Sequence, residues 1–164
     1  MDPDATVSGS LLSLIATSPV ASALKTSAYA YPIVNALHIM GLATLFGAIL
    51  ALDLRLLGAF RSVPAQPLAQ VLPRVAAAGL CVAVTTGALL FSVNPFDYAA
   101  NTAFLTKLVL VTAGALHAVA VHLSPGWTGV LAGAGRIGGG IRVSAAVSLL
   151  IWTSAILAGR FIAF

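Results

Sequence analysis

The stretch that decides the fold is Tyr31 to Gly58, YPIVNALHIMGLATLFGAILALDLRLLG. The hydrocarbon core of a bilayer is about 30 Å thick, and a helix rising ~1.5 Å per residue crosses it with about 20 apolar residues. Pro32 falls in the first turn, where a helix needs no backbone N–H, and Gly58 favours the left-handed conformation that ends a helix. We therefore expect a membrane-spanning helix over about residues 31–57.

The composition of the whole chain also indicates a membrane protein. Of its 164 residues, 60% are apolar and 7% are charged, whereas soluble domains are typically about 25% charged. A chain of this length cannot bury so much apolar surface in a water-exposed globule. The net charge of +4 comes from a few arginines near segment ends, which indicates topology and no nucleic-acid partner. Cys81 is the single cysteine, so an internal disulfide and a cysteine zinc cluster are excluded.

Three further apolar runs follow the first one. They cover about residues 74–93, 102–123 and 141–163, and Asn101 or Thr102 is the expected cap of the middle run. Three prolines predict a loop over 59–73, and glycines predict a flexible linker over 128–140. The predicted fold class is all-α: an integral membrane four-helix bundle over residues 29–164.

The N-terminal region, residues 1–28, is expected to stay outside the bundle. We expect a disordered tail over residues 1–7. Ser18 before Pro19 predicts the start of a short second helix, because serine caps helices and proline suits their first position. Each piece is too short to span, which favours an interfacial helix or helical hairpin. A complete additional span is the alternative.

Two rows of small residues recur at every fourth position. One is Ala43, Gly47 and Ala51; the other is Gly79, Ala83 and Gly87. Such rows let helix backbones approach closely in lipid. They predict close packing within one chain or between copies of a homo-oligomer.

Positive charge is distributed unevenly between the two ends of the predicted spans. Four spans place both termini on one side. The connections on the opposite side hold or border most of the arginines: Arg55, Arg61, Arg74, Arg136 and Arg142. By the positive-inside rule these connections are cytoplasmic, so we expect both termini in the periplasm.

His38 is the main candidate for a functional residue. An ionisable side chain inside a span costs on the order of 2–4 kcal/mol and therefore marks a functional site by default. From the helix rise, His38 lies about 7 Å outward of the bilayer midplane, with Lys107 and Arg160 about 9–10 Å out on the same side. Asn35 and Tyr31 share the helix face of His38. These five residues predict a cofactor-binding site suited to acidic groups.

Simpler roles remain open for the same residues. Lys107 and Arg160 lie close enough to the interface to reach lipid phosphates. His38 could instead form a hydrogen bond between two helices. Asp53 is interpreted as an anchor that forms a salt bridge with a nearby arginine, Arg55, Arg74 or Arg142.

The chain resembles a family of uncharacterised bacterial four-helix inner-membrane proteins over nearly its whole length from Tyr29. The most specific parts are the YP…LH…G opening, the DLRLLG tail of the first span and the AGR-F/W-IA ending. The matching positions are Tyr31, Pro32, His38, Gly41, Asp53, Arg55, Gly58, Lys107, Trp152, Gly159 and Arg160. The resemblance implies the bacterial inner membrane as the location but no settled activity. A weaker likeness, at the level of the fold, is to small b-type cytochromes and copper-resistance membrane proteins.

Haem b binding with electron transfer is the leading functional hypothesis, because inward histidines in a four-helix bundle suit haem. His38 would be an axial ligand, and Lys107 and Arg160 would pair with the propionates. His117 is the other metal-ligand candidate, but its depth differs from that of His38 by about 13 Å. A tilted span, a partner subunit or five-coordinate haem would resolve this difference.

Two alternatives belong to other classes. One is a copper or small-anion site, although His38 and Met40 lie on different helix faces. The other is a non-catalytic subunit or assembly protein that packs on itself or on a larger membrane complex. The chain contains no recognisable Ser-His-Asp set, carboxylate pair or HExxH motif, so a stand-alone enzyme is not favoured.

Overall fold

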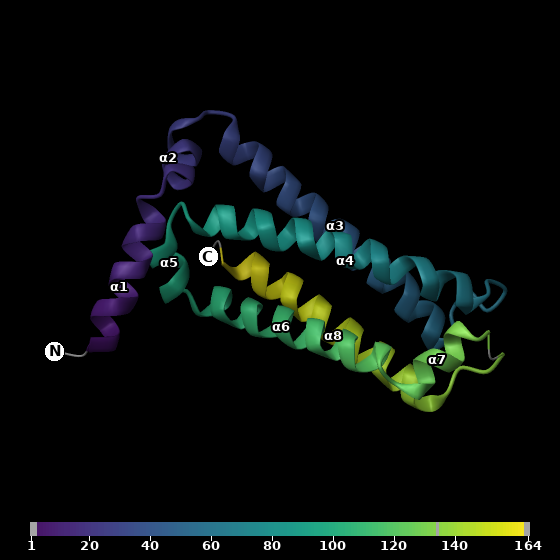
Figure 1. The fold of residues 1–164 in the computed structure, drawn as a ribbon. Coiled ribbons are helices and arrows are strands. Elements are labelled where there is room, and N and C mark those ends of the chain that lie inside the picture. Colours follow the sequence, from purple (N-terminus) through teal and green to yellow (C-terminus); the bar gives the residue numbers. More distant parts are fainter. Residues whose placement is uncertain (1–2, 134, 163–164) are drawn as a thin grey trace.

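The computed structural model describes residues 3–133 and 135–162, and every regular element in that part of the chain is a helix. Figure 1 shows their arrangement. In chain order they are α1 (Pro3–Ala16), α2 (Pro19–Thr26), α3 (Ala30–Leu57), α4 (Ala65–Phe91), α5 (Pro95–Ala100), α6 (Thr102–His122), α7 (Pro125–Leu131) and α8 (Gly139–Phe161).

Four of these helices, α3, α4, α6 and α8, are long and apolar enough to cross a membrane. The predicted fold class, an all-α bundle of four apolar helices, is therefore confirmed. The short helices α1 and α2 precede the bundle, as the sequence indicates.

Local capping explains several helix ends. The Ser18 hydroxyl accepts a hydrogen bond from the Ala21 amide at 3.2 Å, and the Asn101 side chain accepts one from Phe104 at 3.0 Å. Gly58 ends α3 with φ of 112°, a conformation that residues with a Cβ avoid. These caps stand where the sequence predicts them.

The second spanning helix begins earlier than predicted. α4 starts at Ala65 and not near Arg74, so the predicted loop over 59–73 is wrong in its second half. Pro67 lies in the first turn, where its missing N–H removes no hydrogen bond. Pro73 lies inside the helix, which membrane helices tolerate when neighbouring elements compensate.

Short helices also occupy three segments outside the predicted spans, and the sequence predicts irregular structure for two of them, residues 1–7 and 128–140. α1 already begins at Pro3, so the predicted disorder over 1–7 is wrong for 3–7, and residues 1–2 lie outside the described part. α5 follows Asn94 as one short helix. α7 begins at Pro125 after Ser124, whose hydroxyl accepts from the Trp127 amide at 3.3 Å. Ser124-Pro125 thus both ends α6 and starts α7.

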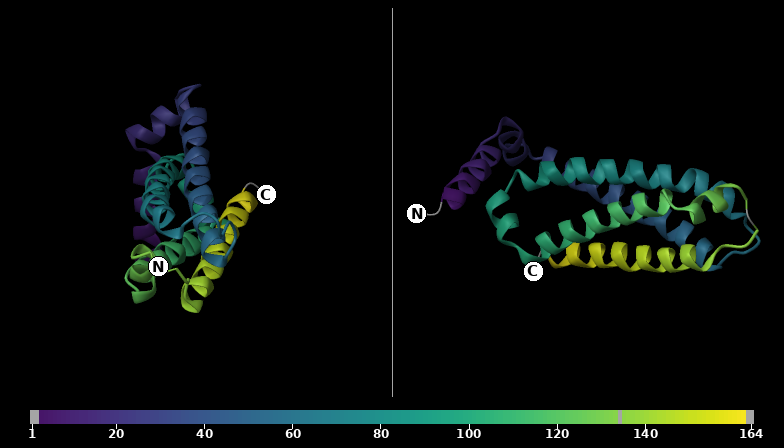
Figure 2. Two further views of the ribbon diagram at one scale, coloured as in Figure 1. Left: turned by 90° about the vertical axis from the view of Figure 1, so that its right-hand side faces the viewer. Right: turned by 60° about the horizontal axis from the view of Figure 1, so that its bottom comes forward.

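The long helices form two pairs. α3 packs on α4, α6 packs on α8, and α3 also contacts α8. α7 contacts α4, α6 and α8 at one end of the bundle, here called the α7 end. At the opposite end, the α5 end, α5 connects α4 to α6 and lies beside α1, as the right-hand view in Figure 2 also shows. The end of α8 lies at the α5 end, on the same side as α1 and α2 (Figure 1).

Glycines bring the backbones of α3 and α4 into contact. A Cβ added to Gly79 would lie 2.6 Å from the Leu45 nitrogen and 2.8 Å from the Gly41 carbonyl oxygen. One added to Gly41 would meet the Ala83 nitrogen at 2.8 Å. The α4 row that begins at Gly79 therefore packs inside the chain, as the small-residue spacing predicts.

The small-residue row on α3 does not pack inside the chain. Ala43, Gly47 and Ala51 are exposed, and a Cβ on Gly47 would meet nothing within 4 Å. The packed face of α3 carries Leu45 and Leu52 instead.

A cluster of buried apolar side chains fills the α7 end of the bundle. It contains Leu52, Leu56, Ala69, Trp127, Val130, Ile141 and Ala145. This core holds α7 against the long helices. It also positions the residues of α3, α6 and α8 that are described below.

Candidate functional site

His38 lies where α3 packs on α4. Its Nδ1 is 2.9 Å from the Ala83 carbonyl oxygen and 3.1 Å from the Thr86 hydroxyl oxygen. Gly87 provides the space for the ring, since a Cβ there would lie 3.1 Å from His38 Cε1. The interhelical hydrogen bond that the sequence left open as an alternative is therefore present.

This hydrogen bond also determines the tautomer. A carbonyl oxygen only accepts, so Nδ1 carries the hydrogen and donates it to Ala83. The Thr86 hydroxyl donates to the Val82 carbonyl at 2.6 Å and can accept from the same imidazole nitrogen. In the neutral ring, Nε2 then bears the lone pair. Histidine ligands of metals are commonly held in this way.

Lys107 of α6 lies toward the same end of the bundle as His38. It is near enough to His38 for their charges to interact. The end of its side chain rests on α8, where a Cβ on Gly159 would lie 3.3 Å from Lys107 Nζ. Arg160 follows Gly159 and is exposed, so His38, Lys107 and Arg160 all lie toward the α5 end.

Tyr31 connects α3 to α5 through a hydrogen bond with Tyr98. Tyr98 also belongs to a ring cluster, with centroids 6.1 Å from Phe91 and 5.3 Å from Phe104. Burial raises the pKa of Tyr98 above its ordinary value, and the interaction with Tyr31, to which the protonated Tyr98 hydroxyl donates, raises the pKa further. Asn35, in contrast, is exposed on α3.

His117 does not join this group of residues. It lines a cavity toward the α7 end, together with Asp53 of α3 and Trp127 of α7. Within the described residues, no group of three His, Cys, Asp or Glu side chains could hold a metal ion. The two predicted metal-ligating histidines thus occupy different parts of the bundle.

Asp53 differs from its predicted role. Its side chain is 6% exposed, and it forms no salt bridge with Arg55, Arg74 or Arg142; its hydrogen-bond partner is Ser148 of α8. The reason is rotational position: Asp53 points between the helices. Arg55 instead donates from Nε to the Val63 carbonyl. The sequence shows a polar residue near the end of a span, but not the direction in which it points.

The fold and these sites define a multi-pass membrane protein with two separate polar regions inside a helical bundle. The chain belongs to the family of unknown function DUF6644, whose family model matches residues 14–164. Comparison with curated proteins and with solved structures found no match for this chain. The resemblance to an uncharacterised family is thereby confirmed at the level of the family.

Proposed function

We propose that the protein binds haem b and transfers electrons within the membrane, with His38 as an axial ligand. The observation that carries this proposal is the orientation of His38. Its Nδ1 donates to the Ala83 carbonyl at 2.9 Å, so in the neutral ring Nε2 carries the lone pair that would ligate iron. A hydrogen bond of this kind fixes the ring and increases the basicity of the ligating nitrogen.

The surroundings of His38 support an acidic cofactor. Lys107 interacts electrostatically with His38, and Arg160 lies beside Gly159, on which the Lys107 side chain rests. These two cations are suited to the two propionates, since charge-assisted pairs are strong where water is scarce. Tyr31 and Asn35 of α3 supply further polar groups toward the same end.

The proposal assigns one axial ligand to each chain. His117 lines the separate cavity near α7, so it is not the second ligand of a haem bound by His38. A second protein ligand, if the haem had one, would have to come from another copy of the chain. A copper site receives less support, because Met40 is 62% exposed and no other histidine accompanies His38.

The test is the visible spectrum of protein purified in detergent from cells supplied with haem. We expect a Soret band that His38→Ala abolishes without a change in helix content. His122→Ala is the matched control. This histidine is exposed on α6, and its Nδ1 donates a hydrogen bond to the Ala118 carbonyl of the same helix. A colourless wild-type protein, or a Soret band that survives His38→Ala, would refute the proposal.

A scaffold or assembly role is the second candidate, and one observation favours it. The row Ala43, Gly47 and Ala51 of α3 is exposed to the surroundings, while α4 provides the close contact inside the chain. Because small residues at this spacing favour helix association in lipid, the row is suited to contact with a second copy or a larger membrane complex. This role and cofactor binding do not exclude each other.

A further inference from the structure

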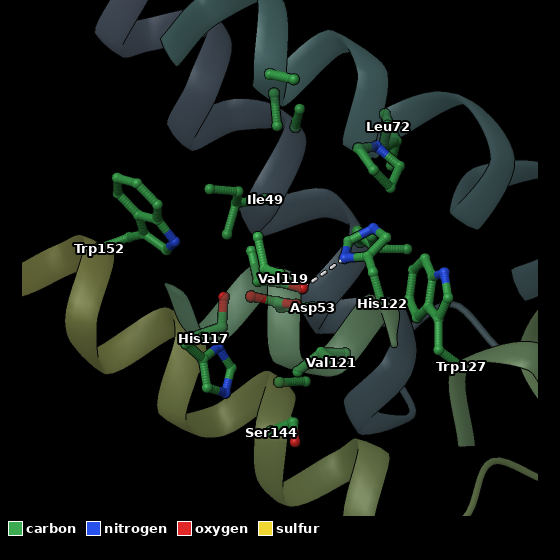
Figure 3. A pocket seen from close by; sticks show the side chains of 18 of the residues that line it. Ile49, Asp53, Leu72, His117, Val119, Val121, His122, Trp127, Ser144 and Trp152 are labelled. Carbon is green, nitrogen blue, oxygen red and sulfur yellow. Dashed lines mark hydrogen bonds between the residues drawn. The ribbon is translucent and has the colours of Figure 1, made fainter. Parts of the chain in front are cut away.

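A cavity of about 540 Å³ lies inside the α7 half of the bundle. Its walls come from α3, α4, α6, α7 and α8. Figure 3 shows Asp53 near its middle, with Trp152 on one side and His122 and Trp127 on the other. The volume falls within the range of small-molecule sites, roughly 300–1,000 Å³.

Asp53 is the distinctive group of this cavity. Its Oδ2 atom is buried and has no hydrogen-bond partner. The carboxyl group interacts with Ser148, which satisfies only part of its capacity as an acceptor. An ionisable side chain that faces the interior of a membrane bundle usually marks a binding site or a pathway.

The other polar residues around the cavity leave the carboxylate uncompensated. Arg74 lines the cavity but is exposed and forms no salt bridge with Asp53. His122 donates from Nδ1 to the Ala118 carbonyl at 2.7 Å, and its ring contacts Trp127 at 4.4 Å between centroids. His117 and Ser144 also line the cavity, but Asp53 Oδ2 has no hydrogen bond to either. The remaining walls are apolar, formed by side chains such as Ile49 and Leu80.

The cavity is accessible from the lipid side of the bundle. α4 and α6 form facing walls of the cavity but do not pack along their length. On α6, two cavity-lining residues are strongly exposed: Val119 at 56% and Leu123 at 81%. These apolar side chains face the bilayer if α6 spans it, so a ligand dissolved in the membrane can enter between the two helices.

We propose that this cavity binds a lipophilic amine. Its ammonium group would pair with Asp53 Oδ2, and its apolar body would fill the space between α4 and α6. One acceptor in an apolar hollow matches a ligand with one cationic donor, because a buried charge is tolerated only when paired. A bare metal ion fits poorly, since no group of three ligating side chains exists in the described residues. This proposal is independent of haem binding at His38.

The chain carries its own reporter for the test. Its two tryptophans, Trp127 and Trp152, both line the cavity. Their emission can excite a dansyl group bound between them. The probe is dansylcadaverine, which ends in an ammonium group at neutral pH. The matched neutral probe replaces that ammonium with a methyl group and keeps the same apolar body.

With wild-type protein in nanodiscs, we expect saturable energy transfer to dansylcadaverine at an affinity at least tenfold above that for the neutral probe. Asp53→Asn should remove this preference, because the amide has nearly the same shape but no charge. Asp97→Asn is the control, since Asp97 is exposed on α5, away from the cavity, and should leave both affinities unchanged.

Two results would overturn the proposal. If wild-type protein binds both probes equally or neither saturably, the cavity takes an uncharged molecule such as a lipid chain, or no small ligand. If Asp53→Asn keeps the preference for the amine, Asp53 is not the recognition group. Because the comparison of probes in the wild type needs no mutant, a variant that fails to fold leaves the test decisive.

Discussion

The Nδ1 atom of His38 on α3 lies 2.9 Å from the carbonyl oxygen of Ala83 on α4. One hydrogen bond thus joins two spanning helices and also orients the ring so that Nε2 is available as a ligand. A structural role and a binding role are compatible in the same side chain. Substitutions at this contact must therefore be assessed by helix content and by cofactor signals together.

Gly79→Ala should lower the stability of the bundle. The added Cβ would lie 2.6 Å from the Leu45 backbone nitrogen, so two backbones must separate, at a cost of about 1–3 kcal/mol. Gly47→Ala is the matched control, because its Cβ would meet nothing within 4 Å. Thermal unfolding in detergent measures both variants. Equal melting temperatures would show that α3 and α4 do not approach so closely.

Hydropathy and capping residues are sufficient to predict the spanning helices. They do not show which side of each helix packs against the other helices. α3 is apolar all round, so its sequence does not distinguish the packed Leu45 from the exposed Ala43. Because α3 is apolar on all sides, the sequence also does not show that the Asp53 side chain points into the bundle. Proline breaks most helices, so the sequence favours a loop at Pro67 and Pro73, although the early turns of a helix and membrane spans both tolerate proline.

The candidate residues near His38 were more predictable. Depth along each helix follows from the constant rise per residue, and it placed Lys107 at the level of His38. The partner of His38 was not predictable, because Ala83 contributes a backbone carbonyl and no distinctive side chain. The cavity beside Asp53 is not predictable for a similar reason: it arises from packing among five helices.

Tyr98 should lose its proton only above the ordinary tyrosine range. Its pKa is raised by burial and then by Tyr31, so its contribution to stability is complete below the ordinary pKa, about 10. That contribution is lost as pH rises through the higher folded-state value. Absorbance at 295 nm should show a late titration step that Tyr98→Phe removes. Tyr29→Phe is the control, because Tyr29 is 78% exposed, and persistence of the late step in Tyr98→Phe would contradict the assignment.

Gly47→Leu should weaken self-association without unfolding the chain. Leucine would block an approach of the exposed α3 row to another helix, and a Cβ at that position would meet nothing within 4 Å inside the chain. Size-exclusion chromatography with light scattering measures the oligomer. Val109→Leu, at a position 68% exposed on α6, is the control for a bulky lipid-facing change. An unchanged oligomer in Gly47→Leu would remove the support for this interface.

Both termini are predicted to be periplasmic. This prediction rests on the uneven distribution of arginines between the connections of the spans. Arg61 and Arg136 lie in connections on the side opposite the termini. An alkaline phosphatase fused to the C-terminus should be active. A fluorescent protein fused at the same position should be dark. An inactive phosphatase together with a fluorescent fusion would reverse the topology.

The most direct test of the central claim is chemical rescue at His38. His38→Gly should remove the Soret band and leave a space where the imidazole ring lay beside Gly87. Adding free imidazole during haem loading should restore the band, because the added ring supplies the missing Nε2 lone pair. No haem spectrum in the wild type, or a spectrum in His38→Gly that is independent of imidazole, would contradict haem ligation by His38.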